Sequence, residues 1–87
     1  MEDKIKDLLE NSLNELNLYV DSVILEKEGN NLFLRICLDS DNLIDLDNIV
    51  SATKIIDPII TEADLISEPY ILDIYGKSKG KVNNGGI

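Results

Sequence analysis

The sequence predicts an α+β fold: a two-layer sandwich in α-β-β-α-β order, with two helices on one face of a three-stranded sheet. Residues 3–17 and 46–57 each carry apolar side chains at the spacing of one helix face. Residues 32–39 alternate between two faces, as a strand does. A chain of 87 residues is expected to form one domain, in which the sheet gives both helices a common apolar surface.

Residues 3–17 are predicted to form the first helix. Glu2 and Asp3 would lie near the positive end of the helix dipole, where acidic side chains are favoured. Burial of each leucine would contribute about 1.5–3 kcal/mol, so the apolar stripe is expected in the core. The stripe consists of Ile5, Leu8, Leu9, Leu13 and Leu16.

An antiparallel hairpin is predicted next, with strands at residues 19–27 and 32–39. The connecting residues 28–31 include Gly29 and two asparagines, which tolerate the positive φ angles of tight turns. In the second strand the leucines at 32, 34 and 38 share one face with Ile36. Phe33, Arg35, Cys37 and Asp39 line the other face.

A second helix is predicted from Leu46 to Asp57, with Asp45 as its N-cap. Pro58 cannot lie inside a helix without kinking it, so it is expected in the first turn of a further helical segment that reaches Glu62. The predicted buried stripe is Leu46, Ile49, Val50, Thr53 and Ile56.

A third strand is predicted after Pro69, over residues 70–75. Because both of its faces carry bulky side chains, it is expected to lie inside the sheet. After residue 75 the composition changes to Gly, Asn, Lys and Ser. The predicted organisation is therefore one domain at residues 1–75 and a flexible tail at residues 76–87.

Charge is distributed unevenly along the chain. Its 8 basic and 17 acidic residues give a net charge of −9. All 17 acidic residues lie in residues 1–75 with only five basic ones, a net charge of −12. This balance argues against direct binding of duplex DNA, which needs a basic face, and favours a basic partner or simple solubility.

Several classes of protein are excluded by composition. A hydrophobic content of 44% is too high for a disordered acidic chain, and no apolar run approaches the ~20 residues that span a membrane. The N-terminus lacks the basic start of a secretory signal, and one cysteine cannot form an internal disulfide. A cytoplasmic protein is therefore expected. The absence of histidine excludes a His-based triad and a zinc site with His ligands.

The densest acidic segment, residues 39–47, does not match a calcium-binding loop. An EF-hand needs Gly at its sixth position and Glu at its twelfth, and these positions hold Ile44 and Val50. Residues 76–78 resemble the end of a phosphate-binding loop, but the glycine required further upstream is replaced by Ile71. Cys37 is expected to be a packed thiol. No catalytic residue, cofactor or metal site is predicted, and the chain is not expected to be an enzyme.

From Leu16 to Ile74 the chain resembles the N-terminal domain of RimP, the bacterial ribosome maturation factor. The similarity runs through short blocks in the family's order: the first strand with its turn, the second strand with its exit, the cap of the second helix, and the final strand. The blocks are residues 23–29, residues 32–36 with Asp39, residues 44–47, Ser51, Asp57 with Pro58, Asp64, and residues 69–74.

The resemblance implies a non-enzymatic assembly factor that binds the immature small (30S) ribosomal subunit and helps a basic ribosomal protein to dock near the decoding centre. It also implies the fold already predicted from the residues. In the family a Ser-Pro-Gly-x-Asp-Arg-Pro type segment leads to a second, barrel-like domain. Residues 75–81 lack that segment, so a stand-alone module, a degenerate paralogue or a fragment is expected.

The predicted partner-binding residues are the acidic side chains of the loop and the start of the second helix: Asp39, Asp41, Asp45 and Asp47. Two alternatives stay open. One is a generic acidic interaction module or nucleic-acid mimic, and the other is an enzyme that uses carboxylates or a metal. Oligomeric state is not readable from the sequence, although an exposed sheet edge could pair with another copy.

Overall fold

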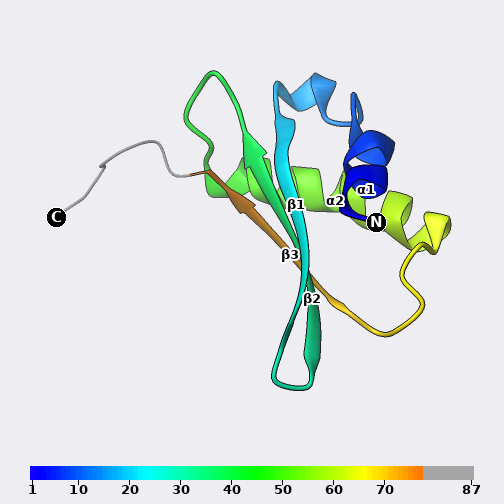
Figure 1. The fold of residues 1–87 in the computed structure, drawn as a ribbon. Coiled ribbons are helices and arrows are strands. Elements are labelled where there is room, and N and C mark those ends of the chain that lie inside the picture. Colours follow the sequence, from blue (N-terminus) through cyan, green and yellow to red (C-terminus); the bar gives the residue numbers. More distant parts are fainter. Residues whose placement is uncertain (78–87) are drawn as a thin grey trace, which may run out of the picture.

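A computed structural model describes residues 1–77 of the chain. Helices and strands follow one another in the predicted α-β-β-α-β order, with one short 3₁₀ turn added (Figure 1). The elements are α1 (Glu2–Leu9), η1 (Asn14–Leu16), β1 (Tyr19–Glu28), β2 (Asn31–Asp39), α2 (Leu46–Ala63) and β3 (Ile71–Gly76).

The sheet is mixed, with strand order β1-β2-β3. The hairpin strands β1 and β2 are antiparallel and pair from Tyr19 opposite Asp39 to Glu28 opposite Asn31. β3 pairs parallel to β2, with Phe33 opposite Ile71. A parallel neighbour requires a crossover connection, and α2 supplies it. The central strand is therefore β2, and β3 is an edge strand, so the predicted interior position of β3 is wrong.

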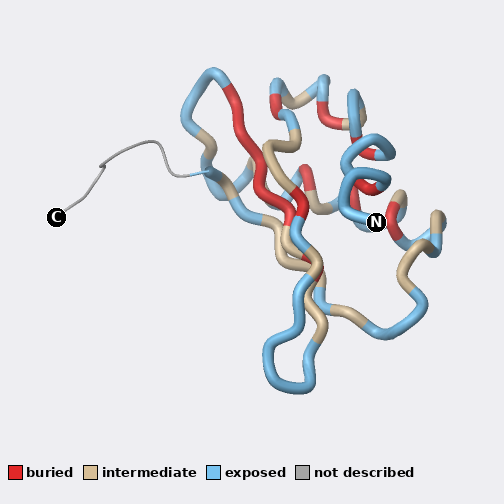
Figure 2. Tube along the Cα trace, in the orientation of Figure 1, coloured by how far each residue is buried: buried red, intermediate tan, exposed pale blue. Residues whose placement is uncertain are grey.

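Both helices cover the same face of the sheet. One buried cluster joins α1 and α2 to the inner face of β2, and Figure 2 shows buried segments in the helices and in the sheet. The side chains of Leu34, Ile36 and Leu38 on this face are fully buried. This face is the one predicted from the alternation of residues 32–39. The α+β two-layer sandwich is confirmed.

The first helix is much shorter than predicted. α1 ends at Leu9, and Asn11 and Asn17 adopt left-handed φ angles of 72° and 58°, which interrupt helical geometry. Leu13 is nevertheless buried as predicted, because the turn between α1 and β1 folds back onto the core. Leu8, in contrast, is exposed.

The second helix is longer than predicted. α2 runs without a break from Leu46 to Ala63, with Pro58 inside it. Ile56 and Ile60, on either side of the proline, are both buried, and their burial holds the two parts of the helix on the sheet.

The buried stripe of α2 also differs from the prediction. Its buried residues are Ala52, Ile56 and Ile60. Leu46 and Val50, predicted for the core, are 76% and 46% exposed. The first turns of α2 therefore present apolar side chains to solvent.

The predicted boundary after residue 75 lies within an ordered strand end. Gly76 is the last residue of β3, and the backbone N–H of Lys77 donates to the Leu38 carbonyl at 2.7 Å. The rest of the predicted tail, residues 78–87, lies outside the described residues.

Candidate partner-binding site

The acidic segment between β2 and α2 begins at a buried carboxylate. Asp39, the last residue of β2, is only 9% exposed. Its Oδ1 accepts a hydrogen bond from the Ser40 backbone N–H at 2.8 Å, and its Oδ2 accepts one from the Tyr19 hydroxyl at 3.3 Å. Asp39 therefore ties the end of β2 to the start of β1.

Ser40 anchors the loop that follows. Its hydroxyl donates to the Asn17 carbonyl at 2.7 Å and accepts from the Asn42 backbone N–H at 3.2 Å. The loop is thus fixed to the turn before β1. Asp41 is exposed directly beside this anchor.

Asp45 is the N-cap of α2, as predicted. The Asn48 N–H donates to Asp45 Oδ1 at 2.8 Å, and the Asp45 N–H donates to Asn48 Oδ1 at 3.0 Å. This reciprocal pair is a capping box with asparagine at its third position, and it satisfies two backbone donors at the helix start. Asp47 is exposed in the first turn of α2.

Exposed apolar side chains lie among these acidic residues. Leu43 in the loop is 82% exposed, and Leu46 and Val50 share one face of α2 because they are four residues apart. We use the name α2-entry surface for the exposed residues Asp41, Leu43, Leu46, Asp47 and Val50. Its combination of carboxylates and apolar side chains suits a partner segment with basic and apolar residues.

Asp41 also lines a shallow hollow. With Asn14, Asn17 and Tyr19 it borders a depression of about 350 Å³. A neighbouring groove of about 390 Å³ shares Asn14 and Tyr19. Its charged lining residues are Asp7 and Glu10, together with one cation, Lys6. Acidic side chains therefore line concave surface on both sides of the turn before β1.

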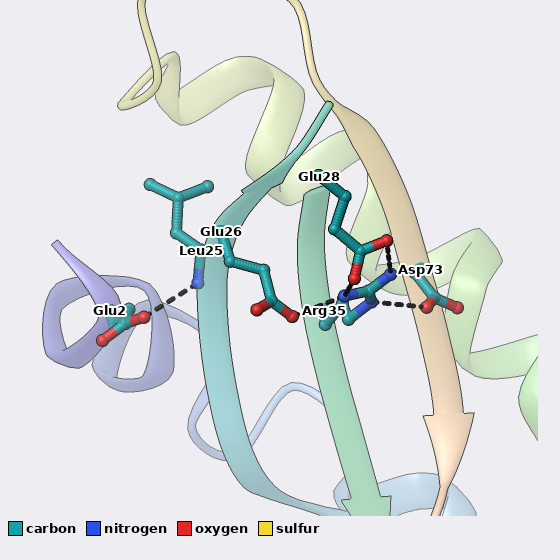
Figure 3. Close-up of polar contacts among 6 residues, drawn as sticks. All are labelled: Glu2, Leu25, Glu26, Glu28, Arg35 and Asp73. Atoms are coloured by element: carbon teal, nitrogen blue, oxygen red, sulfur yellow. Dashed lines mark hydrogen bonds and ion pairs between the residues drawn. The ribbon is translucent and has the colours of Figure 1, made fainter. Parts of the chain in front are cut away.

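A charged cluster that the sequence did not predict lies on the opposite, helix-free face of the sheet (Figure 3). Arg35 on β2 is paired with Glu26 and Glu28 of β1 and with Asp73 of β3. The Arg35–Glu28 contacts are 2.9 and 3.2 Å, and the guanidinium carbon lies 4.4 Å from the centre of the Phe33 ring. One cation thus bridges all three strands.

These contacts change the protonation behaviour of the cluster. Hydrogen bonds from Arg35, reinforced by its charge, hold the pKa of Glu28 below its ordinary value. The pKa of Arg35 is raised in turn, first by its hydrogen bond to Glu28 and then by that to Glu26. Because these three carboxylates already pair with Arg35, they are less available to cations of a partner than carboxylates without such a pair.

Cys37 is a packed thiol, as predicted. It is buried, and this burial raises the pKa of the thiol, with the negative charge of Asp21 acting in the same direction. A thiol of raised pKa is a poor nucleophile near neutral pH.

Within residues 1–77, no three carboxylate or thiol side chains converge as a metal site would require. The same described part of the chain has no helix with the length and apolar character needed to span a membrane.

A comparison with protein-family models shows to which family the chain is related. The model described as the RimP N-terminal domain matches residues 8–76. The match runs from the end of α1 to the last residue of β3, and so includes the whole sheet, α2 and the acidic loop between them. This family is a non-enzymatic domain of a ribosome maturation factor. Since the match spans most of the 87 residues, the chain belongs to the RimP N-terminal domain family.

Proposed function

We propose that this domain assists maturation of the small (30S) ribosomal subunit by binding a basic ribosomal protein through the α2-entry surface. The observation that carries the proposal is the family match over residues 8–76, since the family is associated with the small subunit. The strongly acidic composition of residues 1–75 supports a basic partner, because complementary charge speeds encounter and fixes orientation.

The four predicted acidic residues divide into two roles in this proposal. Asp39 and Asp45 hold the segment in shape, through the bonds to Tyr19 and Ser40 and through the helix cap. Asp41 and Asp47 are the contact residues. Among residues 1–77 no hydrogen bond or ion pair engages their carboxylates, so both can pair with cations of a partner.

The exposed apolar residues add a second component to the interface. Leu43 and Leu46 would bury apolar area against the partner, which contributes about 25 cal/mol per Å² removed from water. Carboxylates alone give an interaction that salt weakens strongly. A mixed surface retains part of its affinity when salt screens the charges.

Co-sedimentation with small ribosomal subunits from growing bacteria tests the proposal. The unmodified chain is expected to sediment with the subunits at low salt and progressively less as salt rises. The double variant Asp41→Lys/Asp47→Lys is expected to bind about tenfold more weakly or worse, because each new lysine repels the basic partner.

Glu62→Lys is the matched single-site control. It reverses one exposed carboxylate near the other end of α2, so its binding is compared with that of Asp41→Lys alone, which changes the net charge equally. Equal loss of binding by these two single variants would assign the effect to net charge and refute the α2-entry surface. Absence of the unmodified chain from subunit fractions at low salt would refute the ribosomal role. Competition with RNA or DNA for unrelated basic proteins would then identify a general nucleic-acid mimic.

A further inference from the structure

The two edges of the sheet differ in whether their outward backbone groups are hydrogen-bonded. At the β1 edge, side chains of α1 engage backbone groups that point away from β2. The Leu25 N–H donates to Glu2 Oε2 at 2.8 Å, and Lys6 Nζ donates to the Asp21 carbonyl at 3.1 Å (Figure 3 shows the first contact). An incoming strand would have to displace α1 from these groups, so the β1 edge is protected.

At the β3 edge, no side chain among residues 1–77 makes a comparable hydrogen bond to an outward backbone group. The Lys77 N–H donates to the Leu38 carbonyl and so points toward β2. Along a strand, the backbone groups of successive residues point alternately to one side and the other. The N–H and C=O groups of Asp73 and Tyr75 therefore point toward β2, whereas those of Leu72 and Ile74 point away from it. Within residues 1–77, no hydrogen bond engages these outward backbone groups of Leu72 or Ile74.

We propose that the outer edge of β3 binds an extended segment of a basic partner by strand addition. Main-chain hydrogen bonds to Leu72 and Ile74 would give affinity, as in other sheets that accept a peptide strand. This inference rests on the proposed function and specifies how the basic protein is held.

Charge favours a basic partner over a second copy of the chain. Residues 1–75 carry a net charge of −12, so two copies meeting edge to edge would bring like charges together. A segment rich in lysine or arginine would instead be attracted by the negative charge of the domain. Close to β3, the carboxylate of Asp73 is shared with Arg35, and the acidic loop lies beyond the strand's carboxyl end.

The β3 edge is continuous with the α2-entry surface. A Cβ built on Gly76 would lie 3.4 Å from the Ile44 side chain, so the loop that carries Asp41 and Leu43 borders the end of β3. A partner strand that follows β3 toward Gly76 would reach this loop directly. Backbone pairing on β3 and side-chain contacts at the loop thus form one interface.

Amide hydrogen exchange, measured residue by residue by NMR, tests the edge with an internal control. In the free protein the Leu72 and Ile74 amides are expected to exchange quickly, and the Asp73 and Tyr75 amides slowly. The probes are short overlapping peptides that cover the basic proteins of the small subunit. At least one peptide is expected to slow exchange at Leu72 and Ile74 about tenfold or more. If no peptide protects these two amides, strand addition is overturned.

A pair of variants tests the same edge on intact small subunits. Ile71 on β3 and Ile24 on β1 lie on the same sheet face and are 45% and 40% exposed. Ile71→Lys would place a cation beside the incoming basic strand and is expected to weaken co-sedimentation about threefold or more. Ile24→Lys makes the same change at the protected edge and is expected to bind as the unmodified chain does.

The outcomes separate the two proposals. If the unmodified chain sediments with subunits, and Ile71→Lys binds as well as Ile24→Lys, strand addition fails and the ribosomal role stands. If the chain does not sediment with subunits but a peptide protects Leu72 and Ile74, the ribosomal role fails and strand addition stands.

Discussion

Arg35 on β2 and Asp73 on β3 are joined across the parallel half of the sheet, with Arg35 Nε donating to Asp73 Oδ2 at 3.2 Å. The same guanidinium binds two carboxylates of β1, so it opposes the repulsion among three acidic side chains on one sheet face. In a chain with a net charge of −9, this cluster is expected to stabilise the fold in addition to the packing of the core.

Replacing Arg35 by methionine is expected to lower the midpoint of thermal unfolding. Methionine keeps an apolar stem beside Phe33 but leaves the carboxylates without their shared cation. Lys27→Met is the control, since the Lys27–Glu68 pair is largely exposed at both ends and such pairs contribute about 0–1 kcal/mol. Equal midpoints for the two variants, measured by circular dichroism, would contradict the bridging role of Arg35.

The pH dependence of stability follows from the lowered pKa of Glu28. A carboxyl group whose pKa falls on folding stabilises the native state above its unfolded pKa, and this contribution is lost as the pH falls through the folded pKa. The stability difference between the unmodified chain and Arg35→Met is therefore expected to be full near neutral pH and to shrink well below pH 4.5. Urea unfolding of both proteins, once near neutral pH and once well below pH 4.5, measures this difference in the free energy of unfolding. A difference that grows on acidification would contradict the assignment.

Loss of the Asp45 cap is expected to cost about 1 kcal/mol in the free energy of unfolding. For a domain of this size, Asp45→Ala should then lower the melting temperature by about 4–8 °C. Asp47→Ala, which removes an exposed carboxylate in the same helical turn and no cap, should have a smaller effect. An unchanged melting temperature for Asp45→Ala would refute the cap assignment.

Two residues of α2 distinguish its buried face from its exposed face. Ile56→Ala is expected to destabilise the domain by about 2–5 kcal/mol, because a fully buried side chain would leave a cavity. Leu46→Ala, at a position 76% exposed, should change stability by less than about 0.5 kcal/mol. Chemical denaturation gives both values, and a large loss for Leu46→Ala would place that side chain in the core.

The sequence predicted the element types and the inner face of β2 well, because alternation along a strand is read directly from its residues. It overestimated the first helix because the spacing of Leu9 and Leu13 fits a helix even where the chain turns between them. Asn11 adopts a left-handed φ angle there, and a single asparagine in a polar stretch is a weak signal of that conformation.

In α2, two apolar stripes overlap at Ile56, so periodicity could not decide which one faces the sheet. The buried stripe passes through Ala52, whose small side chain permits close packing but adds little to a hydrophobic pattern. Pro58 also favoured a helix end, and the burial of the isoleucines on both sides outweighed that preference.

The Asp45 cap could be predicted because it depends only on local sequence. The Arg35 cluster depends on the register of β2 with both neighbouring strands. β3 lies far along the chain, and its parallel register is set by how α2 crosses the sheet, which no local pattern reports. Alternation did place Arg35 on the face opposite Leu34 and Ile36, and that was the available signal.

The mixed sheet also has a consequence for the order in which the chain folds. The β1–β2 hairpin closes across the two-residue turn Gly29-Asn30, and hairpins of this kind form within about 1–10 μs. β3 is separated from β2 in the sequence by the whole of α2, so their pairing has a high entropy cost of loop closure. We expect this pairing to form only after α2 has packed on the hairpin, because the contacts that offset that cost form late. We therefore expect the hairpin and α2 to form the folding nucleus and β3 to dock last, leaving substitutions in β3 to act mainly on the rate of unfolding.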